Sequence, residues 1–357
     1  MQNLEINIKQ KNRSTNVELL RVLCMFLIVV IHYVYHGLGR TGYYTSFDMH
    51  SINDSLRYIT LEPLWVLALT AVNCYVMISG YFLVEKTELR WKGILRTIIQ
   101  TFFYALIIFC LFAVFDHDFP LATLKRVIIP IHSDYYWFVT SYIGLLFVAP
   151  FLSILATSLS KRQYQYLLIV LFVLNFEFLY GTVYSHQRSL LWFSYLYLIA
   201  GYLKLHGMPS FIIKHKGAIF ISTWILLTLF ATMYNSLTWP LFKLKGSDYN
   251  GPVFFLSLAI FIYFVNTSFK KRGSLLTKAA PYTFGVYLIH DNPMVRRVVW
   301  GGVISDSIKI PIIIHCIIVC LIIFVVCILI DFFRAQLFHM LKVNEVMDKL
   351  SLKLPLL

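Results

Sequence analysis

Long apolar runs, separated by short polar and basic stretches, occupy most of the chain between residues 17 and 333. A helix needs roughly 20 mostly apolar residues to cross a bilayer. Ten stretches approach or reach this length: about 17–37, 62–84, 94–115, 136–157, 165–181, 189–205, 217–235, 251–268, 280–300 and 310–333. The pattern predicts an all-α, polytopic membrane protein with about ten transmembrane helices.

The basic residues between these runs predict how the chain is oriented. With the N-terminus inside, the inner segments hold twenty Lys and Arg residues and the outer loops hold ten. Cytoplasmic loops are enriched in Lys and Arg, so both termini are expected in the cytoplasm. We therefore expect a cytoplasmic N-terminal segment over 1–16, a single membrane domain over 17–335 and a cytoplasmic tail over 336–357.

Composition excludes an ordinary soluble enzyme and a disordered chain. Of 357 residues, 59% are hydrophobic and only 13% are charged, whereas soluble domains carry about 25% charged residues. The net charge of +14 comes from cations between apolar runs, which indicates a lipid bilayer rather than nucleic acid as the partner. The six cysteines all lie in apolar runs without metal-binding spacing, so neither a disulfide framework nor a zinc site is expected.

The first apolar run contains the most informative ionisable residues, Arg21 and His32. Their separation of eleven residues is close to three helical turns, about 16 Å, so both lie on nearly the same face. An extended substrate with an anionic head inside and a reactive end further out suits this face, and acyl-coenzyme A has that form. Arg21 would hold phosphate, and a neutral His32 would remove a proton from a hydroxyl. We expect a narrow passage joining the two groups.

A structural alternative explains the same two residues without chemistry. Arg21 would then extend to the inner headgroups, and His32 would form an interhelical hydrogen bond. His32 and His36 are also four residues apart, a spacing that can hold a metal. A metal needs a third ligand, and none is close in sequence, so the sequence predicts no metal site.

Other spans carry further candidates. Ser79 and Gly80 lie near the inner end of the second span, where helix packing or donor binding would use them. Tyr136 and Trp137 open the fourth span and suit either an interfacial aromatic belt or a sugar-binding entrance.

Two ionisable neighbours, His290 and Asp291, fall near the middle of the ninth span, where Pro293 is expected to disrupt the helix. Such groups are costly in a membrane unless they line a cavity, which favours a substrate-binding role. Asp331 is expected near a span end, where solvation is cheap, and it is given no role.

Five stretches, taken in order, resemble the membrane acyltransferase family three. They are Glu-Leu-Leu-Arg at the first span, the Arg–His spacing of eleven, SGYFL in the second span, YWFVTSYIGLLFVAPFL in the fourth and TFGVYLIHDNP in the ninth. The resemblance runs from about residue 15 to 335. It implies a bacterial inner-membrane protein of about ten spans that transfers acyl groups, mostly acetyl, to sugars of surface glycans.

The resemblance also implies roles for individual residues. His32 matches the essential histidine of the family and Arg21 its partner arginine, while Trp137 and Phe138 match its aromatic pair. His290 and Asp291 match its polar step in the ninth span. The sequence departs from the family at RWKGILRTIIQ, which lacks the Arg-x-x-Arg pair thought to contact coenzyme A. Arg21 and Arg96 are therefore the candidates for holding the nucleotide.

The resulting prediction is an O-acetyltransferase with His32 as general base. Acetyl-CoA is the expected donor, a hydroxyl of an extracytoplasmic or lipid-linked glycan the expected acceptor, and no tightly bound cofactor is expected. Three alternatives remain: a glycan transporter or flippase, a lipid-dependent glycosyltransferase and a non-catalytic scaffold. A transporter would show paired helix breaks in two matching halves. A glycosyltransferase would use acidic residues of the outer loops: Asp48, Asp54, Asp116 and Asp118. A scaffold would leave the Arg21–His32 spacing without a purpose.

Overall fold

The part of the protein that the structure, a computed structural model, describes consists of helices joined by short turns and loops. That part comprises residues 2–38, 52–115, 123–128, 135–175, 190–237, 251–268, 274–303 and 310–355. The first elements are α1 (Gln2–His32), η1 (Tyr33–Leu38, a π-helical turn), α2 (Ile52–Ala68), α3 (Ala71–Leu83), α4 (Trp91–Phe115), α5 (Thr123–Ile128), α6 (Trp137–Ser158), α7 (Lys161–Asn175) and α8 (Leu190–His206). These are followed by α9 (Ser210–Leu237), α10 (Gly251–Val265), α11 (Ser274–Ala279), η3 (Ala280–Tyr282, a 3₁₀ turn), α12 (Thr283–His290), α13 (Pro293–Val303), α14 (Ile312–Met340) and α15 (Val343–Lys353). The predicted all-α class is confirmed.

Six stretches of the described chain are long and apolar enough to cross a membrane. They are Thr15–Leu38, Thr60–Leu83, Trp91–Phe115, Trp137–Ser158, Ser210–Thr232 and Ile312–Met340. Each coincides with a predicted span. The predicted spans at 165–181, 189–205 and 251–268 correspond to the shorter α7, α8 and α10, and residues 176–181 lie outside the described part. Ten spans and cytoplasmic termini stay predictions.

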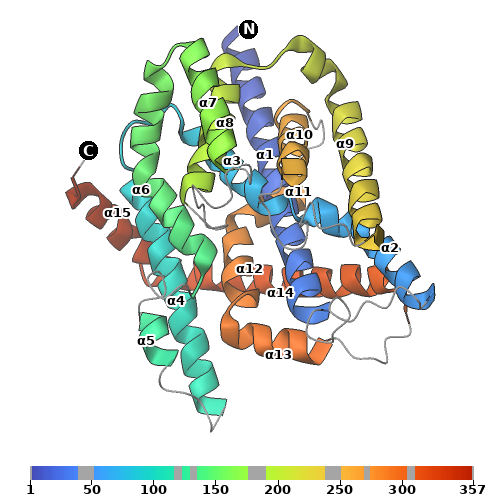
Figure 1. The fold of residues 1–357 in the computed structure, drawn as a ribbon. Coiled ribbons are helices and arrows are strands. Elements are labelled where there is room, and N and C mark those ends of the chain that lie inside the picture. Colours follow the sequence, from blue (N-terminus) through green and yellow to red (C-terminus); the bar gives the residue numbers. More distant parts are fainter. Residues whose placement is uncertain are drawn as a thin grey trace.

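The predicted ninth span is two helices rather than one. α12 has 8 residues and α13 has 11, so at 1.5 Å per residue neither reaches across the roughly 30 Å hydrocarbon core. The chain changes direction between them (Figure 1). The expected disruption at Pro293 is therefore confirmed, and it is strong enough to end one helix and begin another.

α1 is the central helix of the molecule (Figure 1) and packs against α2, α3, α10, α12 and α14. Its residues Leu20, Val29 and Val30 are fully buried. Lipid is as apolar as these side chains, so helices associate in membranes chiefly through close packing, which small residues promote. Gly80 on α3 is such a residue. A Cβ atom there would lie 2.4 Å from the carbonyl oxygen of Tyr197, so α3 and α8 come together only because position 80 has no side chain.

Both predicted terminal segments contain helix. α1 begins at Gln2, within the segment expected over 1–16, and α14 continues to Met340, beyond the expected span end. α15 then docks on the start of α4, where Asp348 lies 2.7 Å from the amino group of Lys92 and Trp91 donates to the carbonyl oxygen of Pro355 at 2.8 Å.

Candidate active site

Two helix ends meet to form the candidate site. His32 is the last residue of α1, and the π-helical turn η1 follows it and carries His36. Such π-turns inside helices often occur at functional sites. The rings of His32 and His36 lie 5.2 Å apart, so the turn presents both imidazoles together.

The other half of the site is the break between α12 and α13, and its local sequence explains the break. His290 ends α12, Asp291 and Asn292 form the turn, and Pro293 is the first residue of α13. Proline suits this first position because no backbone donor is needed there. The side-chain oxygen of Asn292 accepts a hydrogen bond from the backbone nitrogen of Met294 at 3.0 Å, which caps the new helix.

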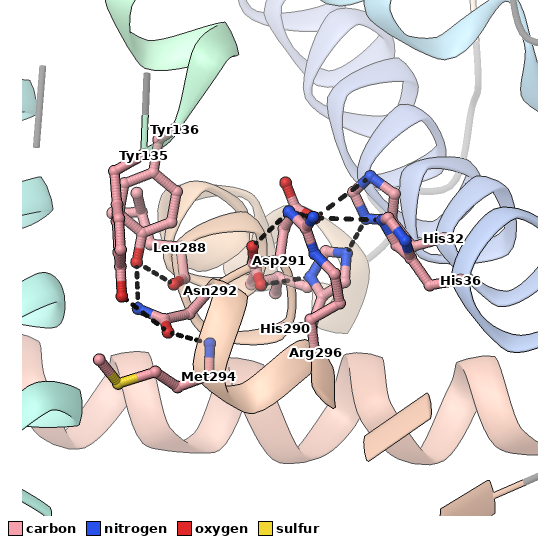
Figure 2. Close-up of polar contacts among 11 residues, drawn as sticks. His32, His36, Tyr135, Tyr136, Leu288, His290, Asp291, Asn292, Met294 and Arg296 are labelled. Carbon is pink, nitrogen blue, oxygen red and sulfur yellow. Dashed lines mark hydrogen bonds and ion pairs between the residues drawn. The ribbon is translucent and has the colours of Figure 1, made fainter. Parts of the chain in front are cut away.

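The two halves meet at His32 and His36 on one side and His290 and Asp291 on the other, and Arg296 contacts Asp291 (Figure 2). His32 Nδ1 lies 2.8 Å from His290 Nε2. Asp291 Oδ1 lies 3.5 Å from His32 Nε2 and 3.8 Å from His36 Nε2. Arg296, one turn into α13, donates from Nη2 to the same carboxylate oxygen at 2.7 Å and to the main-chain oxygen of Asp291 at 2.9 Å. Within the described residues, the histidines and the carboxylate that the sequence singled out thus form one cluster.

A backbone carbonyl determines how the hydrogen atoms of this cluster are arranged. His290 Nδ1 lies 2.5 Å from the carbonyl oxygen of Val286, which can only accept, so Nδ1 donates to it. Nε2 of neutral His290 then has a lone pair and accepts the hydrogen on His32 Nδ1. Neutral His32 therefore keeps its own lone pair on Nε2, the nitrogen that faces Asp291.

The consequence is that acceptor atoms converge on one point. A lone pair on His32 Nε2 and the carboxylate oxygen of Asp291 repel each other unless a proton, a hydroxyl donor or a cation lies with them. The separation of 3.5 Å exceeds an ordinary N–H···O hydrogen bond of about 2.7–3.2 Å. The arrangement suits a group that accepts a proton from an incoming hydroxyl.

Tyr136, one of the predicted substrate-binding residues, links α6 to this turn. Its hydroxyl donates to the carbonyl oxygen of Leu288 at 2.8 Å and accepts from the side-chain amide of Asn292 at 2.8 Å. Tyr136 is fully buried, so in this structure its hydroxyl serves the turn. Trp137 is half-buried and contacts the ring of Phe138.

The inner candidates lie on α1, α3 and α6. Arg21 Nη1 lies 2.6 Å from both carboxylate oxygens of Glu18, so its charge is partly balanced. Ser79 forms a 2.9 Å hydrogen bond with the hydroxyl of Tyr142 on α6.

The expected passage between Arg21 and His32 is filled. Met25 and Ile28 lie on the same face of α1 between the two, at intervals of four, three and four residues, and both are buried in the core. A substrate that touches both groups would have to displace these apolar side chains. Arg96 is exposed on α4, and no hydrogen bond or ion pair of the described residues links it to Arg21.

The position of Asp331 in the sequence suggested that it lies near solvent, but in the structure it does not. It is completely buried, and its carboxylate accepts from the side chains of Gln100 at 2.9 Å, Tyr104 at 2.8 Å and Arg334 at 2.7 and 3.0 Å. Removal of one partner of such a buried pair is strongly destabilising. Since α4 and α14 supply these groups, the network joins two helices that lie far apart in sequence.

Sequence reasoning missed three features of the site. Asn292 and Arg296 were not singled out, although an Asn directly before a Pro is a recognisable start signal for a helix. The third feature is a possible metal site: His32, His36 and Asp291 each offer one ligand atom, and these atoms lie within 4.8 Å of one another. Asp291 is distant in sequence, so spacing alone could not supply this third ligand.

Comparison with known families identifies the family of the chain. The family model described as an acyltransferase domain matches residues 14–332, which include the whole histidine cluster. Comparisons with curated proteins and with solved structures found no match. The match covers nearly the whole chain, and the chain therefore belongs to acyltransferase family three.

Proposed function

We propose that this protein transfers an acetyl group from cytoplasmic acetyl-CoA to a hydroxyl of an extracytoplasmic or lipid-linked glycan. Its family supports acyl transfer, and its apolar helices support a membrane location. We place it in the bacterial cytoplasmic membrane as a multi-pass protein. The observation that carries the proposal is the chain from Val286 through His290 to His32, which leaves a proton-accepting nitrogen beside a carboxylate.

In the proposed step, His32 Nε2 takes the proton of the acceptor hydroxyl. The hydroxyl oxygen attacks the thioester carbonyl carbon, the carbon–sulfur bond breaks, and the electron pair leaves with sulfur. The imidazolium then returns the proton to the sulfur, so the products are an O-acetyl ester and free coenzyme A. A positioned general base of this kind contributes about 10²- to 10⁴-fold to the rate.

Asp291 stabilises the charge that develops on His32. Its carboxylate lies 3.5 Å from Nε2 and is held by Arg296. An opposite charge at about this distance favours the protonated imidazole. His290 acts through His32 and is a positioning residue, because both of its ring nitrogens already bond within the protein.

Arg21 is the proposed contact for the phosphates of the donor, together with Arg96, and Ser79, whose hydroxyl bonds to Tyr142, is proposed to help bind the donor. Phosphate would compete with Glu18 for the guanidinium of Arg21. The thioester reaches His32 only after the side chains of Met25 and Ile28 move. Methionine is unbranched and flexible, which makes its movement inexpensive.

The glycan is proposed to approach from the outer side. Trp137 offers an aromatic face for sugar stacking, next to Tyr136 in the sequence and near the α12–α13 turn that Tyr136 holds. Asp291 is the polar group of the turn that an acceptor hydroxyl would meet together with His32.

Family membership, rather than the described residues, separates the alternatives. Asp48, Asp116 and Asp118, which a glycosyltransferase would use, lie outside the described part, and the side chain of Asp54 is not described either. A flippase needs paired helix breaks in matching halves. Membership in an acyltransferase family favours acyl transfer over both.

Transfer of labelled acetyl from acetyl-CoA to surface glycan in membrane vesicles tests the proposal. We compare the wild type with His32→Gln and with the control His339→Gln, a change at an exposed histidine of α14. Loss of the base should lower transfer about 10²- to 10⁴-fold, while the control keeps the wild-type rate. A well-folded His32→Gln protein that transfers acetyl normally would refute His32 as the base. Absence of acetyl transfer in the wild type would refute the activity itself.

A further inference from the structure

The convergence of His32, His36 and Asp291 has a second chemical meaning. A lone pair on His32 Nε2, a nitrogen of His36 and a carboxylate oxygen all face one point. Such a group of acceptors attracts a cation. We infer that these three side chains bind a divalent transition metal of the zinc class, which would occupy the same His32 nitrogen that the proposed acyl transfer uses as its base.

The distances between the candidate ligand atoms fit such an ion. Ligands held about 2.0–2.1 Å from a tetrahedral zinc lie about 3.3 Å from one another. Asp291 Oδ1 lies 3.5 Å from His32 Nε2 and 3.8 Å from His36 Nε2, and the three ligand atoms all lie within 4.8 Å of one another. Small side-chain rotations would close the remaining gaps.

The chemistry of the three donors indicates the class of metal. Two imidazoles with one carboxylate suit zinc and other first-row transition metals, whereas magnesium and calcium prefer oxygen ligands. Three protein ligands leave a fourth position open, as in zinc sites that bind water or substrate.

Groups behind the ligands resemble the support that metal sites need. A histidine that binds a metal through one ring nitrogen usually donates a hydrogen bond from the N–H of the other to a fixed acceptor, which orients the ring. His32 does this through His290 and the carbonyl oxygen of Val286.

The site is also reachable. The side chain of His36 is 26% exposed, that of His32 12%, and that of Asp291 only 3%. A metal would therefore enter past His36 and reach the buried carboxylate last. The two imidazoles lie close together because His32 ends α1 and His36 lies in the π-helical turn η1 that follows it.

One feature opposes the metal and makes the inference more specific. Arg296 brings a positive charge to Oδ1, the oxygen nearest to both histidines. A divalent ion at this point is repelled by the guanidinium. Removal of that charge in Arg296→Gln should therefore tighten metal binding, whereas loss of an ordinary supporting residue would weaken it.

The test uses Co²⁺ alone as the probe on the purified full-length protein in detergent. Binding to nitrogen and oxygen ligands gives a visible absorption band, and equilibrium dialysis gives the stoichiometry. The wild type should bind one Co²⁺ per chain, in competition with Zn²⁺. His36→Gln should bind at least about tenfold more weakly, in line with the 10- to 100-fold losses seen for supporting residues alone.

His315→Gln is the matched control, since His315 bonds to Tyr33 and is outside the cluster. It should bind Co²⁺ like the wild type. If His36→Gln does not fold, Asp291→Asn replaces it with nearly the same shape. The inference is wrong if the wild type gives no band, or if folded His36→Gln and Asp291→Asn both bind as tightly as the control. Because the readout is absorbance, these outcomes are distinct from failure of the acetyl-transfer assay.

Discussion

His32 donates from Nδ1 to Nε2 of His290 across 2.8 Å, although 258 residues separate the two in sequence. The contact joins the end of α1 to the end of α12. Because His290 is itself fixed by the carbonyl oxygen of Val286, this single contact determines which nitrogen of His32 accepts a proton.

His290→Leu should therefore lower kcat for acetyl transfer by about 10²-fold, because His32 loses the acceptor that selects its tautomer. The KM for acetyl-CoA should stay unchanged, since His290 does not contact the donor. His290→Gln keeps an acceptor oxygen near the position of Nε2 and should recover most of the rate. Steady-state kinetics on the purified variants measures both constants. Equal losses in the two variants would show that His290 matters only for packing.

Asp291→Asn tests the stabilisation of the imidazolium. The amide keeps the shape of the side chain but has no negative charge, so kcat should fall by about 10- to 100-fold, equivalent to roughly 1.4–2.7 kcal/mol. The control is Asp348→Asn on α15, which removes the negative charge that pairs with Lys92 in an exposed ion pair. Exposed ion pairs contribute about 0–1 kcal/mol, so the control should keep its activity. Wild-type kcat in Asp291→Asn would remove the carboxylate from the mechanism.

Substitutions of Arg21 and of Glu18 should change the KM for acetyl-CoA in opposite directions. A hydrogen bond to a charged group contributes about 1.5–3 kcal/mol, so Arg21→Gln should raise the KM for acetyl-CoA about 10- to 100-fold. Glu18→Gln frees the guanidinium from its 2.6 Å partner and should lower that KM. Initial rates over a range of acetyl-CoA concentrations measure both effects. A rise in KM in both variants would mean that the pair acts structurally.

The sequence was sufficient for the local features of the site. Ionisable residues are rare in apolar runs, so Arg21, His32, His290 and Asp291 could be identified from position alone. The break before Pro293 was also predictable, because proline has no backbone donor and fits the first turn of a helix.

The contacts between distant segments could not be predicted. Nothing in the sequence indicates that Asp291 faces His32 and His36, because this depends on how α12 packs on α1. Asp331 was judged by its distance from a span end, but burial in a membrane protein depends on neighbouring helices. Met25 and Ile28 are apolar and would be equally stable facing lipid or a protein core. The sequence therefore could not indicate that they are buried where the passage was expected.

The Asp331 network leads to a prediction about stability. A Cβ atom at Gly285 on α12 would lie 2.2 Å from Cγ of Asp331, far inside contact distance. α12 can therefore pack this closely on α14 only without a side chain at position 285. The buried carboxylate cannot move aside freely, because Gln100 and Tyr104 on α4 and Arg334 on α14 hold it.

Gly285→Ala should destabilise the protein by about 1–3 kcal/mol, the usual cost of overpacking a core. Thermal unfolding in detergent measures this as a lower Tm. Acetyl transfer should fall as well, because a shift of α12 moves His290 away from His32. Gly93→Ala is the control, since it lies in α4 with nothing within 4 Å of the added atom, and alanine there should raise stability slightly. If Gly285→Ala unfolds at the same temperature as Gly93→Ala, α12 and α14 do not pack as closely as the structure shows.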